Sequence, residues 1–128
     1  MAKIQRFEDL EMWKSARSLA GMIYCLANKG SFSKDFGLRD QICRAAVSIM
    51  SNIAEGFDRH SDKSFSSFLD IARGSAAEVR SQLYVALDIG YITQDEFQSA
   101  YNAVVSVGMM ITKFIQYLRP SDDKTIRR

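Results

Sequence analysis

The side chains that could do chemistry in this sequence are few, and their spacing forms no catalytic or metal-binding pattern. The single histidine, His60, has no cysteine or serine at the spacing of a catalytic motif. There is no HExxH helix, paired-cysteine zinc motif, EF-hand loop or glycine-rich phosphate loop, and no Glu-x-x-His pair of the di-iron bundles. The sequence therefore predicts a protein that is not an enzyme and that uses no metal or cofactor.

Basic side chains between positions 59 and 80 form a candidate phosphate-binding cluster. Its members are Arg59, His60, Lys63, Arg73 and Arg80. The alternative is a set of scattered surface cations, with Asp58, Asp62 and Asp70 as their partners. Because the net charge is only +2, nucleic-acid binding depends on where these cations lie, not on the total charge.

A second candidate site is a polar stripe, spaced so that its members share one helix face. The stripe consists of Gln41, Arg44, Ser48, Asn52, Glu55 and Arg59. Its small polar side chains suit an interface or a buried hydrogen-bond network, and a solvated outer face is the alternative. The counterpart is Gly74, Ser75 and Glu78, where a helix-interior glycine indicates either a close helix approach or plain tolerance.

Four amphipathic segments must position these residues. Apolar side chains recur every three or four residues, as in Met12, Ala16, Leu19 and Ile23, which is typical of a helix. The pattern predicts helices over about 8–28, 36–57, 62–89 and 93–118, followed by a polar tail over 121–128. The connections are short, so neighbouring helices run antiparallel. We therefore predict an all-α, up-down-up-down four-helix bundle in one domain, 1–128.

Local signals place the helix ends. We expect Glu8, Asp9 and Glu11 in the first turn of the first helix and Gly30 to end it, followed by a polar connection over 30–35. Ser61 or Asp62 is placed to cap the third helix, and Gly90 to end it. Thr93 and Glu96 form a T-x-x-E capping box before the fourth helix, which Pro120 ends.

The fourth helix is unusually apolar, since Lys113 is its only charge between Phe97 and Leu118. Its apolar residues spread over roughly 240° of the helix, where one core needs a stripe a little over 100°. We expect this helix to mediate self-association. The alternative is an unusually apolar helix that remains on the surface of a monomer. Cys25 and Cys43 sit among apolar neighbours and are expected to be buried, reduced thiols. No segment is apolar enough for a membrane span or leader, which favours the cytoplasm.

Three stretches carry a resemblance to a known family. They are FEDLEMWKSARSLAGMIY (7–24), FGLRDQICRAAVSIMSNIAEGFDRHS (36–61) and FLDIARGSAAEVRSQLYVALDIGYI (68–92), with RAAVSIMSNIAEG the most specific part. They resemble the bacterial four-helix bundle proteins encoded in intervening sequences of large-subunit ribosomal RNA genes. That family is similar to the accessory variability determinant proteins of diversity-generating retroelements, which are pentameric and bind nucleic acid.

The resemblance implies a homopentamer without enzymatic activity, and RNA or a nucleoprotein as its leading partner. Two functions follow. The first is a non-catalytic, oligomeric RNA-binding protein. The second is a scaffold that binds another protein through the polar stripe or the apolar fourth helix, without nucleic acid. Neither requires a membrane or a small-molecule substrate.

Overall fold

The computed structural model describes residues 3–119, and within that range the chain is almost entirely helical. The long helices are α1 (Glu11–Ala27), α2 (Phe36–Phe57), α3 (Asp62–Ile89) and α4 (Gln94–Leu118). Two 3-10 turns, η1 (Phe7–Asp9) and η2 (Gly30–Lys34), precede α1 and α2. No strand occurs in the described range, which confirms the all-α prediction. Pro120 and the predicted polar tail lie outside it.

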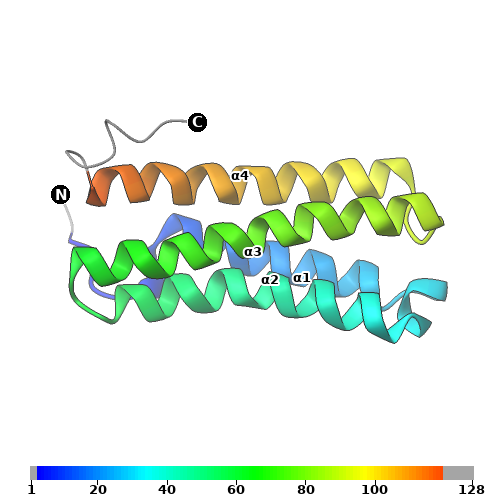
Figure 1. Cartoon of the computed structure of the whole chain (residues 1–128), viewed down its shortest axis with the longest axis horizontal. Coiled ribbons are helices and arrows are strands. Elements are labelled where there is room, and N and C mark those ends of the chain that lie inside the picture. Colours follow the sequence, from blue (N-terminus) through cyan, green and yellow to red (C-terminus); the bar gives the residue numbers. More distant parts are fainter. Residues whose placement is uncertain (1–2, 120–128) are drawn as a thin grey trace.

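The four helices lie side by side along the length of the molecule (Figure 1). Each packs on the next in the chain, and α4 also packs on α1, so the helices surround one core in chain order. The short connections require antiparallel neighbours. The predicted up-down-up-down bundle is confirmed. It has four sides, each formed by two adjacent helices: α1–α2, α2–α3, α3–α4 and α4–α1.

The ends of α2, α3 and α4 are set by local chemistry, as predicted for the last two. The Ser61 hydroxyl accepts a hydrogen bond from the Ser64 amide at 3.1 Å, and Gly90 ends α3 in a left-handed conformation with φ of 91°. Thr93 and Glu96 form the full capping box. Two hydrogen bonds to the Glu96 carboxylate lower the pKa of Glu96. The one from the Thr93 backbone amide has the larger effect, and the one from Lys29 the smaller.

The start of the first helix differs from the prediction. Glu11 lies in the first turn of α1 as predicted, but Glu8 and Asp9 lie in η1. The capping position is held by Leu10, whose side chain is buried. The helix also ends earlier than expected, at Ala27. Gly30, with φ of 51°, begins η2 instead of ending α1.

The predicted polar connection over 30–35 is an ordered turn that closes one end of the bundle. Phe32 of η2 is buried and stacks on Tyr91, with ring centroids 5.2 Å apart. The Asp35 carboxylate accepts two hydrogen bonds, one from the Leu38 amide at 3.1 Å and one from the Tyr91 hydroxyl at 2.8 Å. Asp35 therefore caps α2 and ties it to the α3–α4 connection.

The core runs the full length of the bundle and uses the predicted stripes. Fully buried side chains from all four helices include Leu19, Ile23, Ile49, Ile53, Leu69, Leu83, Val104 and Ile111. Among the glycines, only Gly56 on α2 lies close against a neighbouring helix. A Cβ atom there would lie 2.8 Å from Phe68 Cβ and 3.0 Å from Phe65 Cδ1 of α3.

Candidate functional site

The polar stripe and its counterpart come together in a shallow groove on the α2–α3 side, with a volume of about 360 Å³. From the predicted set, Gln41, Arg44, Ser48, Ser75 and Glu78 line this groove. The Ser75 hydroxyl donates to Ser48 Oγ at 2.9 Å across the two helices, and Asn52 donates to the carbonyl and hydroxyl of Ser48. The central serines are therefore a hydrogen-bonded contact between helices.

Four residues of the predicted stripe and its counterpart do not line this groove: Asn52, which binds Ser48 from outside it, and Glu55, Arg59 and Gly74. Glu55 and Arg59 form an ion pair with each other at 3.0 Å, one turn apart on the surface. Gly74 makes no close helix approach, because an added Cβ atom would meet no heavy atom within 4 Å. Of the two alternatives for Gly74, tolerance is correct, and the close approach belongs to Gly56.

Sequence reasoning missed Gln82, which also lines the α2–α3 groove. Its Oε1 atom is buried and accepts no hydrogen bond from any described residue. Ser75, Glu78 and Gln82 are spaced by three and four residues, which could have placed Gln82 beside the counterpart set.

The five predicted cations do not form one cluster. Arg59, His60 and Lys63 surround the α2–α3 turn, where His60 has φ of 63°, and all three are exposed. Arg73 lies ten residues beyond Lys63 on α3, or about 15 Å along the helix, and Arg80 about 26 Å. Five cations within one stretch of sequence are therefore divided between the end of the bundle and its α3–α4 side.

Arg73 and Arg80 face a groove between α3 and α4 with a volume of about 410 Å³. Lys113 of α4 lines the same groove, which places three cations around it. Its apolar lining comes from Ala76, Ala77, Val104, Val105, Gly108 and Met109, and no acidic side chain within residues 3–119 lines it. Lys113, noted in the sequence only as an isolated charge, joins the site because α4 packs against α3.

One carboxylate borders this groove. Asp70 of α3 binds Arg73 at 2.8 Å and Arg119 at 2.8 Å, so two guanidinium groups share one negative charge. Arg80 and Lys113 form no ion pair with any residue in the range 3–119. The described side chains therefore give this side an excess of positive charge. We name Arg73, Arg80, Lys113 and Arg119 the α3–α4 basic face.

Aromatic rings continue from this basic face toward the α3–α4 connection. The Arg80 guanidinium lies 5.8 Å from the centre of the Tyr101 ring. Tyr84, one turn after Arg80, packs on Phe97 at 4.9 Å and on Tyr101 at 5.8 Å, yet is 48% exposed. A hydrogen bond with Tyr101, and then the charge that Tyr101 gains when it ionises, raise the pKa of Tyr84.

A comparison with protein families identifies the chain. The family model described as 23S rRNA-intervening sequence protein matches residues 8–113, which include all four helices apart from the last turn of α4. This chain belongs to the 23S rRNA-intervening sequence protein family.

A solved structure supports the same assignment. The chain is similar to a crystal structure from Bacteroides thetaiotaomicron, described as a protein of unknown function from the S23 ribosomal protein family. The TM-score is 0.76 at 25% sequence identity, and the match covers 82% of this chain and 98% of the other. No curated protein matches the chain.

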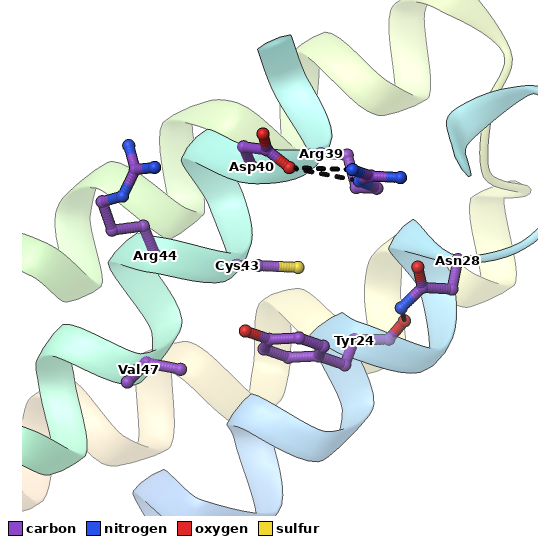
Figure 2. Close-up of a pocket in the computed structure, with 7 residues that line it drawn as sticks. All are labelled: Tyr24, Asn28, Arg39, Asp40, Cys43, Arg44 and Val47. Atoms are coloured by element: carbon purple, nitrogen blue, oxygen red, sulfur yellow. Dashed lines mark hydrogen bonds and ion pairs between the residues drawn. The ribbon is translucent and has the colours of Figure 1, made fainter. Parts of the chain in front are cut away.

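A further groove, of about 560 Å³, lies between α1 and α2. Figure 2 shows Cys43 of α2 pointing its sulfur toward α1, with Tyr24 beside it. Arg39 is held by Asp40 at 3.1 Å and by the Ser33 carbonyl at 3.0 Å. Burial raises the pKa of the Cys43 thiol, which lowers its thiolate fraction and its reactivity.

The cysteine prediction is half right. Cys43 is buried and reduced, but Cys25 is exposed, and the two form no disulfide. Within residues 3–119 no three His, Cys, Asp or Glu side chains come together to hold a metal ion. In the same range, none of the helices combines the length and hydropathy that a membrane span requires.

Proposed function

We propose that this 23S rRNA-intervening sequence protein is a non-catalytic, homo-oligomeric protein that binds nucleic acid on its α3–α4 basic face. The observation that carries the proposal is the groove of about 410 Å³, in which Arg73, Arg80 and Lys113 surround an apolar floor without an acidic side chain. Phosphate contacts supply most of the affinity of such binding, and they require cations gathered on one face.

The family description supports RNA as the nucleic acid, because it names an rRNA intervening sequence. The near-neutral total charge of +2 does not oppose the proposal, since several acidic residues lie elsewhere. Glu55 pairs with Arg59 on the α2–α3 side and Glu96 with Lys29 near the start of α4. The excess of positive charge therefore lies on the α3–α4 side, which favours that side for binding nucleic acid.

The arrangement of the four sides also supports a ring of subunits. The α4–α1 side lies opposite the α2–α3 side, and a cyclic oligomer needs two different surfaces that meet in each contact. On α4, Tyr117 is 74% exposed. On α3, Ile71 is exposed, and the Gln82 Oε1 atom has no partner among the described residues. We propose that the α4 surface of one copy packs on the α2–α3 side of the next.

Light scattering tests the assembly. We expect about five times the 14.5 kDa chain mass, the stoichiometry that the family resemblance implies. Tyr117→Asp and Ile71→Asp should each break the ring, because each buries an unpaired charge in one half of the same contact. Mixing the two variants should give only a 1:1 dimer, since each retains one intact surface.

Tyr24→Asp, on the α1–α2 side, is the matched control and should leave the mass unchanged. A wild-type monomer would refute the assembly. If both interface variants kept the full mass, the contact would lie on other sides of the bundle.

Salt-dependent binding tests the basic face. If three phosphates are neutralised by Arg73, Arg80 and Lys113, affinity should fall about 40-fold for a duplex and about 20-fold for a single strand between about 50 and 200 mM salt. Replacing Arg80 and Lys113 by Gln should weaken binding to every sequence alike and lower the salt slope by about two. The measurement is fluorescence anisotropy with a labelled RNA over a salt series.

Arg17→Gln with Lys34→Gln is the control, because it removes the same charge from exposed positions of α1 and η2. A further variant, Arg59→Gln with Lys63→Gln, tests the α2–α3 turn. If only that variant weakened binding, the site would lie at the turn. An absence of RNA binding at about 50 mM salt would instead favour the protein-binding scaffold.

A further inference from the structure

We infer that the α3–α4 basic face takes single-stranded nucleic acid, with an unpaired base stacked on Tyr84. This inference rests on the proposed function and names its substrate class. Single-strand-binding proteins combine a positively charged groove, which follows the phosphates, with aromatic rings on which bases stack. Both elements occur here on the α3–α4 side of the bundle. Arg80 of the basic face lies over the Tyr101 ring, which packs against Tyr84.

The residues concerned lie in a line along one helix. Arg73, Arg80 and Tyr84 are seven and four residues apart on α3, which places them on the same face. From Arg73 to Tyr84 the helix rises about 16 Å, the length of about five stacked nucleotides. Asp88 is exposed one turn beyond Tyr84. Its negative charge repels phosphate and therefore ends the stretch that a nucleic-acid strand can follow.

Tyr84 is built as a rigid platform and not as a free surface side chain. Phe97 and Tyr101 pack against its ring at 4.9 and 5.8 Å, yet nearly half of the residue remains exposed. Arg80 lies over Tyr101 at 5.8 Å, which places a cation beside the platform. A phosphate on Arg80 would thus bring the attached base within reach of the Tyr84 ring.

The groove floor distinguishes a single strand from a duplex. Ala76, Ala77, Val104 and Gly108 offer no side-chain hydrogen-bond donor to a phosphate, but they suit the flat, apolar face of a base. Thr112 and Gln116 are the uncharged polar residues of the lining. In a duplex the base faces are covered by their neighbours, so only the phosphates could reach the cations. A single strand can use the cations, the apolar floor and the tyrosine together.

The test compares strands that differ only in the availability of base faces. The probes are a labelled mixed-sequence RNA strand, the DNA strand of the same sequence, the blunt RNA duplex and an RNA strand with abasic positions. Wild type should bind the intact strands more tightly than the duplex or abasic strand. Comparison of RNA with DNA shows whether the ribose hydroxyl contributes.

Tyr84→Leu should weaken single-strand binding by about 5- to 150-fold, the range for loss of one stacked base. It should leave duplex and abasic-strand binding unchanged, and Tyr84→Phe, which keeps the ring, should bind like wild type. Tyr24→Leu is the matched control, because Tyr24 is 45% exposed but lies on the α1–α2 side. Circular dichroism verifies that each variant is folded.

The outcomes separate the two proposals. Wild type that binds none of the four probes overturns both the proposed function and the stacking. Salt-dependent binding that is equal for strand, duplex and abasic strand, and insensitive to Tyr84→Leu, leaves the basic face in place and overturns the stacking alone. The comparison of probes on the wild-type protein decides the question even if Tyr84→Leu fails to fold.

Discussion

Leu83→Ala is expected to lower the free energy of unfolding by about 2 to 5 kcal/mol, the largest effect of any single substitution considered for this bundle. Leu83 lies on α3, is fully buried and belongs to the continuous core of all four helices. Truncation removes three carbon atoms from contact and leaves a cavity that long, regular helices cannot readily collapse to fill.

The measurement is urea unfolding followed by circular dichroism, at matched protein concentrations because association adds to apparent stability. Leu83→Met is the control at the same position. It conserves volume and should cost less than about 1.5 kcal/mol. If Leu83→Ala changed the stability by less than about 0.5 kcal/mol, as surface substitutions do, the assigned core face of α3 would be wrong.

Gly56→Ala is expected to destabilise the bundle by about 1 to 3 kcal/mol, although alanine is the better helix former. The added methyl group would lie 2.8 Å from Phe68 Cβ and 3.3 Å from the Phe65 carbonyl oxygen. These neighbours are a side-chain root and a backbone atom, so neither can rotate away. Relief requires α2 and α3 to separate around Gly56.

Gly74→Ala is the matched control, with the opposite sign. The same methyl group there would meet no heavy atom within 4 Å, so only the helix preference changes, and stability should rise by up to about 1 kcal/mol. Thermal unfolding of both variants against wild type gives the comparison. Equal effects at the two positions would contradict the close approach at Gly56.

Where the sequence predicted the fold well, the deciding interactions are local. The ends of α3 and α4 depend on Ser61, Gly90, Thr93 and Glu96, whose partners lie within three or four residues. The start of α1 could not be read this way. Its capping position holds Leu10, which has no side-chain cap and is buried against the rest of the core.

The candidate sites were less accessible to sequence reasoning, because neighbours in sequence point to different sides of the bundle. Cys25 is adjacent to apolar residues but out of phase with the buried stripe of Ile23 and Leu26, and it is exposed. Arg73 and Lys63 lie on one helix, yet Arg73 turns toward α4. Only the packing of α4 reveals that Lys113 and Arg119 share its surroundings.

The two hydrogen bonds of the Asp35 carboxylate have a consequence for local unfolding. One oxygen holds the first turn of α2, and the other holds Tyr91 in the connection that leads into α4. If either segment opens, the carboxylate loses a partner and the remaining segment loses part of its support. Segments separated by more than fifty residues in sequence are thereby joined at this end of the molecule, where they should exchange their amide protons as one cooperative unit.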